Sequence, residues 1–446
     1  MISKTAYYVI ASFIVALLVN IFFFLLLFGS DRIPLLFPDS SGYISVAKQF
    51  NNFELPNFSQ RTFVYPLYLS VFTAIGNLKA AVYGQVVIGA LSVSILYLII
   101  AKLTHNSRLV FLITAIAGLD YYVIFYQSAI ISETIAVFVV LSFIYAHTVK
   151  INQSLSFKSA LPLFLIDLLV IFTRPIYVLL PISVYFYHIF LNRFSNWNKR
   201  EIKKNLTIFL IGIGINLFVV AGWSYFNYAR YGFFGFSDIS DINLLGKIVQ
   251  YNYIDTELTS APFPADMVIK IKKENPSFSN PYLIINQLKT EGVYSLANLK
   301  KINRFFLRDK KIDFAFMGII SIPTAFYGPR TSDFASILYS QADLNNLNIL
   351  ILFTVILADT LVNPLRFIAI FFTLIGVVYF RRRKDDKRSQ IMAILAIIIL
   401  YNVTVGSLLV YGNYSRHLVP IYPILNSLIL LMFLSLIPSL RKQLIK

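Results

Sequence analysis

The segment AYYVIASFIVALLVNIFFFLLLF, residues 6–28, contains no charged side chain and decides the class of fold. As an α-helix it would be about 34 Å long, enough to cross the roughly 30 Å hydrocarbon core of a bilayer. It is too long for the apolar core of a signal peptide, and no cleavage site of small residues is evident at Phe28-Gly29-Ser30. We therefore interpret it as a retained membrane span.

The composition of the 446-residue chain extends this interpretation beyond the first segment. Hydrophobic residues make up 57% and charged residues only 13%, about half the usual charged share of a soluble domain. The mean hydropathy of +0.70 excludes a soluble globular fold, and also a disordered or collagen-like chain. The chain contains no Cys, which excludes disulfides and thiolate metal sites. The composition predicts an all-α polytopic membrane protein.

Apolar blocks of roughly 18 to 22 residues recur along the chain and predict about ten transmembrane helices. We expect them at residues 6–28, 81–101, 108–126, 131–149, 160–173, 176–191, 206–226, 362–380, 390–411 and 418–438. Two further apolar stretches, 312–327 and 348–361, are shorter than a comfortable span, and we expect interfacial helices there. If both crossed the membrane, the count would be twelve.

The charges of the connectors predict the orientation of these helices. The connectors on the side of the N-terminal tail hold 19 Lys and Arg in fewer than 50 positions, with only Glu201, Asp385 and Asp386 as acids. By the positive-inside rule, both termini are cytoplasmic in a multi-pass protein of the cell membrane. This distribution also accounts for the net charge of +18, so we expect no nucleic-acid partner.

Three regions follow from the spacing of the spans. Residues 1–226 form a seven-helix membrane module, 227–361 an external or interfacial segment, and 362–446 a three-helix membrane module. In the first external loop, Asp39 precedes a short stretch with apolar residues at helical spacing. That pattern predicts an amphipathic helix lying on the membrane.

Ionisable side chains at membrane depth are candidates for function, because their burial is costly. Six of them lie at the external ends of helices or in external loops, although the topology was derived from connector charge alone. They are Asp39, Arg61, Glu133, Arg174, Arg416 and His417. Three other acids, Asp120, Asp167 and Asp359, belong to no motif, and we expect helix-end or interhelical hydrogen bonds for them.

The two acids among the six have roles open to more than one interpretation. Asp39 is either a helix N-cap or a general base that accepts a proton from an incoming hydroxyl. Glu133 is either a first-turn acid favoured by the helix dipole or a second acid facing Asp39 across an external cavity. Two such carboxylates could hold a divalent cation between them.

The cationic residues also have two interpretations each. Arg61, followed by Tyr65-Pro66, either reaches lipid headgroups or binds substrate. Arg174 lies between two apolar spans and needs an anionic partner, either a phosphate or an internal carboxylate such as Asp167 or Glu133. Arg416-His417 either snorkel to the interface or bind an anionic headgroup.

Motifs of soluble enzymes are missing from the sequence. It contains no Gly-rich phosphate loop, no HExxH zinc helix and no convincing nucleophile elbow. With four His and no Cys, a His-rich metal centre is not expected.

Taken together, these motifs resemble the GT-C superfamily of polyprenyl-phosphate-dependent glycosyltransferases, and within it the branch of protein O-mannosyltransferases and lipid A aminoarabinose transferases. The resemblance rests on Pro38-Asp39-Ser40-Ser41-Gly42-Tyr43, Arg61 with Tyr65-Pro66, Ser132-Glu133, Thr173-Arg174-Pro175, and Arg416-His417 with Tyr422-Pro423. It covers most of the chain. One departure is that Ser40 follows Asp39, where protein mannosyltransferases have a second acid.

The resemblance implies an inverting transfer of a sugar on the external face. The donor would be a polyprenyl-phosphate sugar, and the acceptor a hydroxyl of a glycan, lipid or protein. Asp39 would act as base with Glu133 as second catalytic acid, while Arg61, Tyr65, Arg174, Arg416 and His417 would bind the donor phosphate or substrate. The resemblance does not imply an absolute metal requirement, because polyprenyl phosphate leaves readily.

Two other classes of function remain as alternatives. A polysaccharide polymerase or ligase shares the lipid-linked donor, but typically has its arginines and histidines in a late long loop. A transporter or flippase of a lipid-linked solute would show inverted repeats and helices broken at mid-membrane, and neither half of this chain resembles the other.

Overall fold

A computed structural model describes residues 3–28, 33–118, 120–150, 155–191, 199–258, 260–278, 280–327, 346–383, 385–411 and 414–438. Within these ranges the regular structure is helical, apart from one isolated bridge between Leu35 and Ala129. The prediction of an all-α polytopic membrane protein is confirmed, because several of the helices are long and apolar enough to cross a bilayer.

The helices follow in this order: α1 (Lys4–Phe28), α2 (Ser40–Asn51), α3 (Val64–Ala74), α4 (Leu78–Ile100), α5 (Ser107–Gly118), α6 (Tyr121–Gln127), α7 (Glu133–Val149), α8 (Phe157–Thr173), η1 (Pro175–Tyr177), α9 (Leu180–Phe186), η2 (Tyr187–Leu191), α10 (Lys199–Tyr231), α11 (Ile239–Gln250), α12 (Ala265–Glu274), α13 (Pro281–Thr290), α14 (Leu296–Leu307), α15 (Lys311–Ile320), α16 (Ile322–Tyr327), α18 (Asn346–Arg382), α19 (Asp386–Leu409), α20 (Tyr414–Leu418), η3 (Val419–Ile421) and α21 (Tyr422–Leu436).

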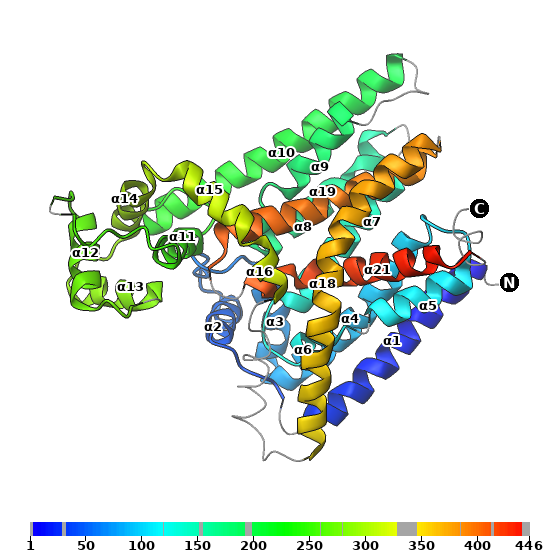
Figure 1. Cartoon of the computed structure of the whole chain (residues 1–446), viewed down its shortest axis with the longest axis horizontal. Coiled ribbons are helices and arrows are strands. Elements are labelled where there is room, and N and C mark those ends of the chain that lie inside the picture. The colour runs from blue at the N-terminus through cyan, green and yellow to red at the C-terminus, as the bar shows by residue number, and fades with distance from the viewer. Residues whose placement is uncertain are drawn as a thin grey trace.

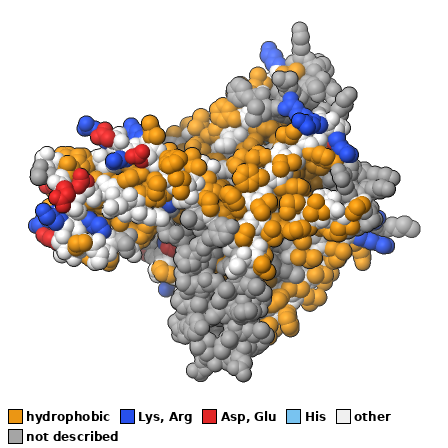
Figure 2. Space-filling view, in the orientation of Figure 1, with side chains coloured by type: hydrophobic (Ala, Val, Ile, Leu, Met, Phe, Trp, Pro, Cys, Tyr) orange, Lys and Arg blue, Asp and Glu red, His pale blue; other side chains and the backbone are white. Residues whose placement is uncertain are grey.

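The long helices form a bundle with two different ends. Figure 1 shows both chain ends at one end of the bundle, and α11 to α14 at the opposite end. Hydrophobic side chains cover the face of the bundle seen in Figure 2, whereas acidic and basic side chains gather on α11 to α14. An apolar belt between polar ends is the surface expected of a protein embedded in a bilayer.

The number of spans is smaller than the ten expected from the sequence. Among the described residues, six helical segments are long and apolar enough to cross a membrane, and seven if the bent pair of α5 and α6 forms one span. They are Lys4–Leu26, Leu78–Ile100, Glu201–Tyr231, Thr360–Arg382, Lys387–Leu409 and Arg416–Leu436.

The other three expected spans, 131–149, 160–173 and 176–191, form shorter helices. Helices α7 and α8 have 17 residues each, or about 26 Å, and α9 has seven. The apolar runs are interrupted by irregular backbone before Glu133 and at Arg174-Pro175, which hydropathy alone does not register. The interrupted backbone lies at the site described below.

The two short apolar stretches of the external segment differ from each other. Residues 312–327 form α15 and α16, of ten and six residues, which are too short to cross the membrane. Residues 348–361 are not a separate helix, because α18 continues through Pro364 to Arg382. Figure 1 shows that α18 changes direction along its length, as a proline inside a helix favours.

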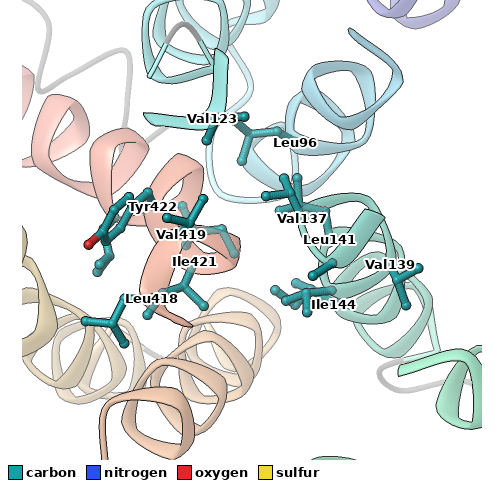
Figure 3. Close-up of a cluster of buried hydrophobic side chains, with 14 of the residues drawn as sticks. Leu96, Val123, Val137, Val139, Leu141, Ile144, Leu418, Val419, Ile421 and Tyr422 are labelled. Carbon is teal, nitrogen blue, oxygen red and sulfur yellow. The ribbon is translucent and has the colours of Figure 1, made fainter. Parts of the chain in front are cut away.

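Helix α7 lies at the centre of the bundle. Figure 3 shows Val137 of α7 beside Leu96 of α4, and Val419 and Ile421 of η3 across from α7. Most of α7 is buried inside the protein. α7 is therefore a core helix of the bundle, and its 17 residues are shorter than the candidate membrane spans.

The segments between the spans carry structure of their own. The amphipathic helix expected after Asp39 is present as α2, with Tyr43, Val46 and Ala47 buried on one face. The sequence did not predict α3, or the separate hydrophobic core formed by α11 to α14. We call α11 to α14 the external unit.

Candidate active site

Asp39 lies directly before α2, but its carboxylate makes no capping hydrogen bond to the helix. Its Oδ1 instead accepts a 2.7 Å hydrogen bond from Arg61 Nη2, and its Oδ2 accepts a 2.6 Å hydrogen bond from Arg416 Nη2. The interpretation of Asp39 as only a helix cap is therefore wrong.

Glu133 is the first residue of α7, and its side chain is fully buried. Its Oε1 accepts hydrogen bonds from Arg174 Nη2, at 2.7 Å, and from Arg416 Nε. Because Arg416 contacts both acids, one chain of ion pairs connects Arg61, Asp39, Arg416, Glu133 and Arg174. We call these five residues the arginine–carboxylate cluster. Three arginines less two carboxylates leave a formal charge of one positive unit.

Backbone contacts bring the segment between α1 and α2 to the start of α7. Leu35 N donates to Ser128 O at 2.9 Å, and Ile130 N donates to Leu35 O at 3.0 Å. Ser40 Oγ adds a 2.8 Å hydrogen bond to Ile130 O. These bonds attach the residues around Asp39 to the turn between α6 and α7.

A proline positions the third arginine. Arg174 has an extended backbone, with φ −151° and ψ 140°, and ends α8, because the residue before a proline is disfavoured in a helix. Its Nε donates to Ser132 Oγ at 3.2 Å, next to the ion pair with Glu133. Of the two internal partners predicted for Arg174, the structure therefore has Glu133.

Arg61 packs against a glycine and an aromatic ring. Its guanidinium carbon lies 4.8 Å from the centre of the Tyr43 ring. A Cβ on Gly42 would lie 3.1 Å from Arg61 Nε, so any larger residue at position 42 would press on the guanidinium. This close approach gives a physical reason for glycine at position 42 of the segment Asp39-Ser40-Ser41-Gly42-Tyr43.

The cluster forms part of the wall of a cavity of about 730 Å³. Asp39, Arg61, Arg174, Arg416 and His417 line this cavity directly, whereas Glu133 lies behind them. The external unit contributes to the same wall through α11 and α13. The structure therefore brings six of the seven predicted site residues together, at the end of the bundle away from the termini.

Several polar atoms in and beside the cluster are buried without a hydrogen-bond partner in the described part of the chain. They are Arg61 Nε, Glu133 Oε2, Arg174 Nη1, Tyr177 Oη and His417 Nδ1. Leaving such a group unpaired typically costs about 1–3 kcal/mol. Three of these residues, Arg61, Arg174 and His417, line the cavity, so their unpaired nitrogens lie where a polar ligand could reach them.

The charges of the cluster determine the protonation state of the Asp39 carboxyl group. Burial alone would raise its pKa, but the charges and hydrogen bonds of Arg416 and Arg61 hold the pKa of this carboxyl well below its usual range. Burial lowers the pKa of Arg61, yet Tyr43 and Asp39 raise it above its usual value. With these ion pairs in place, Asp39 is therefore a stable anion and a weak base.

Tyr65 is the predicted site residue that the structure separates from the others. Its side chain is fully buried, and its hydroxyl donates to Gln85 Oε1 at 2.9 Å. Its ring packs edge-on against Tyr43, which itself lines the cavity. Tyr65 therefore supports a wall residue and does not line the cavity.

Sequence reasoning missed the residues that the external unit adds to the cavity. Asn243 of α11 and Tyr282 of α13 line it, and both lie in a segment without a recognisable motif. The only sequence signal in this region is the amphipathic pattern of the short helices. It predicts which face of each helix is buried, but not that the opposite face lines a cavity.

Two of the acids expected to have structural roles have them. Asp120 caps α6 by accepting from Tyr122 N at 3.0 Å. Asp167 contacts His147 Nε2 at 3.1 Å and accepts from the Tyr185 hydroxyl at 2.6 Å. The side chain of Asp359 lies outside the described residues.

The divalent cation considered between Asp39 and Glu133 stays a prediction. A guanidinium occupies the position between the two carboxylates, because Arg416 contacts both. The described residues contain no group of three His, Asp or Glu suited to a metal ion. A cation bound there would have to displace Arg416.

The fold and site define a polytopic, all-helical membrane protein with a charged cavity at one end of its bundle. Comparison of the chain with protein-family models, with curated proteins and with solved structures found no match in any of the three.

Proposed function

We propose that this protein is an integral-membrane glycosyltransferase, which moves a sugar from a polyprenyl-phosphate donor to an acceptor hydroxyl with inversion. One observation carries the proposal: three arginines share two carboxylates at the wall of a 730 Å³ cavity. The arginines are suited to the donor phosphate, and the exposed carboxylate to an acceptor hydroxyl.

The charge of the cluster supports a donor with a single phosphate. The cluster has one positive charge in excess, and a sugar linked through a phosphodiester carries one negative charge. A diphosphate-linked donor would bring two and leave the site negative. Arg174 Nη1 and Arg61 Nε, which lack partners in the described residues, are donors available to the phosphate oxygens.

In the proposed reaction, the acceptor oxygen attacks the anomeric carbon as the bond from that carbon to the phosphate oxygen breaks. The bonding electrons leave with the polyprenyl phosphate, and the acceptor proton passes to Asp39. Arg174, Arg416 and Arg61 stabilise the negative charge that grows on the phosphate. Every step uses side chains that line one cavity.

The ion pairs of Asp39 give donor binding a second effect, a change in the basicity of this carboxylate. Arg416 and Arg61 occupy both carboxylate oxygens of Asp39, so it is a poor base until they are engaged elsewhere. A donor phosphate competes for the same guanidinium groups. When it takes their hydrogen bonds, the pKa of Asp39 rises toward its ordinary value and the carboxylate becomes a better base. The donor therefore binds before the acceptor is activated.

The proposed location follows from the connector charges. Both termini would lie in the cytoplasm and the cavity on the external face of the cell membrane. Support comes from the two chain ends lying together, at the end of the bundle away from α2 and the external unit.

The test is an assay for bond cleavage. The purified protein in nanodiscs is incubated with a panel of polyprenyl-phosphate sugars and acceptors, and released polyprenyl phosphate is measured. Release that depends on the acceptor is expected for at least one pair. The matched control is Asp266→Asn, an exposed acid of the external unit, which should release as much as wild type. Movement of intact donor across the bilayer without cleavage would overturn the proposal in favour of a transporter.

A further inference from the structure

A second cavity opens at the end of the bundle that holds the chain termini. It measures about 330 Å³ and lies between α18 and α21, with Met392 of α19 and Leu103 beside them. Ile375 and Leu436 in its walls are 62% and 72% exposed, so the cavity opens on the apolar outer surface of the bundle. We call it the basal groove. Its shape and lining suit a hydrocarbon chain.

Cations gather at the polar end of the basal groove. Arg383 lies 4.9 Å from the centre of the Tyr379 ring, and Arg388 lies 5.8 Å from that of Phe380. Tyr379 and Phe380 line the groove, and the two guanidinium groups stack on these rings without lining the cavity themselves. Lys102 directly precedes Leu103, another lining residue, and its ammonium lies 5.5 Å from the centre of the Tyr145 ring of α7, beside the groove.

Two of these three cations have no acidic partner in the described part of the chain. Among the described side chains, Asp385 pairs with Arg388 at 3.4 Å, and no ion pair reaches Lys102 or Arg383. Burial lowers the pKa of Lys102, and the charge of Lys387 lowers it further. Excess positive charge beside an apolar groove is complementary to a molecule with a hydrocarbon tail and an anionic head.

Two hydroxyls give an independent indication of a polar ligand. Thr104 Oγ1 and Tyr379 Oη are buried and have no hydrogen-bond partner in the described part of the chain. Both belong to residues that line the basal groove, and the Thr104 side chain is only 2% exposed. Each could donate to a phosphate or ester oxygen.

We propose that the basal groove binds one anionic phospholipid from the leaflet at this end of the bundle. An acyl chain lies between α18 and α21, and the phosphate contacts Arg383 and Lys102. The site is independent of the proposed glycosyl transfer, since it lies at the opposite end from the arginine–carboxylate cluster. In the proposed topology it faces the cytoplasmic leaflet.

The experiment measures lipid binding by native mass spectrometry on the delipidated protein. Phosphatidylglycerol and phosphatidylcholine with identical acyl chains are titrated separately. In wild type, the first phosphatidylglycerol should bind at least tenfold more tightly than phosphatidylcholine. The variant with Lys102→Gln and Arg383→Gln should weaken phosphatidylglycerol roughly 30-fold, at about fivefold per cation, and leave phosphatidylcholine unchanged.

Two further variants separate charge from shape. Arg382→Gln removes an exposed cation one residue from Arg383, and it should bind phosphatidylglycerol as wild type does. Ser435→Phe places a ring in the groove and should weaken both lipids equally. Equal affinity of wild type for the two lipids would overturn the proposal. So would equal loss of phosphatidylglycerol in Arg382→Gln and in the double variant. Thermal unfolding in phosphatidylcholine confirms that each variant is folded.

Discussion

Two clusters of arginine and carboxylate in the described part of the chain differ in how completely their polar atoms are paired. In the second cluster, Arg366 of α18 donates to Asp120 Oδ2 through Nη2, to Asn363 Oδ1 at 2.9 Å and to Asn426 Oδ1 at 2.9 Å. Its guanidinium carbon lies 4.0 Å from the centre of the Tyr422 ring. Arg366 and Asp120 are each about 1% exposed at the side chain.

The comparison shows what separates a structural ion pair from a binding site in this protein. Every nitrogen of the Arg366 side chain has a partner, and Asp120 uses both oxygens. In the arginine–carboxylate cluster, Arg61 Nε, Arg174 Nη1 and Glu133 Oε2 have none among the described residues. That cluster lines a cavity, whereas Arg366 and Asp120 line neither of the two cavities described above. Both clusters contain arginine and carboxylate, but the arginine–carboxylate cluster is the less buried of the two and keeps unused donors and acceptors among the described residues.

The largest expected effect tests the cluster through Asp39. Asp39→Asn keeps the size of the side chain but removes the base, and general-base catalysis is worth about 10²- to 10⁴-fold. Turnover in the release assay should fall by that factor. Thermal stability should fall somewhat, because the ion pairs with Arg61 and Arg416 are lost, so turnover is compared per folded molecule. Near-normal turnover would make Asp39 a structural partner of the arginines and overturn the proposed mechanism.

The next effect tests the second cluster. Arg366→Leu leaves Asp120 buried without its counter-charge, and breaking a buried ion pair costs about 3–5 kcal/mol. The unfolding temperature in detergent should drop, while turnover per folded molecule stays normal. Adding Asp120→Asn should restore most of the stability, because Asn still caps α6 and carries no charge. A specific loss of turnover without loss of stability would show that Arg366 is functional as well.

A third effect asks whether Arg174 resembles Arg366 or binds donor. Charge-assisted hydrogen bonds are worth about 1.5–3 kcal/mol, so Arg174→Ala should weaken donor binding roughly 10- to 100-fold. Arg174→Lys should lose less, because it keeps the charge but not the forked geometry. Asp39→Asn should bind donor as tightly as wild type or more tightly, since Asp39 competes with the phosphate. Unchanged donor affinity in Arg174→Ala, together with lower stability, would assign Arg174 a purely structural pairing.

The smallest expected effect is on the pH dependence of stability and involves Asp238. Asp238 is a buried carboxylate without an arginine ion pair in the described residues. Burial raises its pKa to about 6, despite a hydrogen bond from Gln60 and the charge of Arg61. Because the folded pKa exceeds the unfolded value of 3.8, the folded state binds the proton more tightly, and stability is lost as pH rises through about 6. Between pH 5 and 7 the loss should be about 1 kcal/mol.

Asp238→Asn should remove this pH dependence, because the amide does not titrate. The measurement is the unfolding free energy of both proteins at pH 5 and pH 7, with the exposed Asp266→Asn as control. A difference between wild type and Asp238→Asn that stays constant with pH would contradict the assignment.

Sequence reasoning found the acids and bases of the site but not the lengths of the helices around them. The one-sided placement of Asp39, Arg61, Glu133, Arg174 and Arg416 was visible from connector charge, and the structure joins these five through ion pairs. Ten spans were expected, whereas six or seven segments of the described residues are long and apolar enough to cross a membrane. Hydropathy does not indicate where the backbone stops being helical.

Arg366 shows the other limit of sequence reasoning. It lies within an expected span, yet its partner Asp120 is 246 positions away in the chain. Asp120 was expected to form a helix-end or interhelical hydrogen bond, and no local pattern indicated which helix would supply the partner. Tyr65 was wrongly grouped with the cavity for the same reason, since the direction of a side chain depends on packing.

The sequence by itself determined that this is an all-helical membrane protein, because apolar segments of sufficient length and basic connectors have few other physical solutions. It also determined which charged residues are too costly to bury without a reason. Only the tertiary structure decided which of those charges are fully paired and which keep unused donors and acceptors facing a cavity. That difference arises from contacts between residues far apart in the chain, and a hydrogen bond depends on distance and angle that no local pattern specifies.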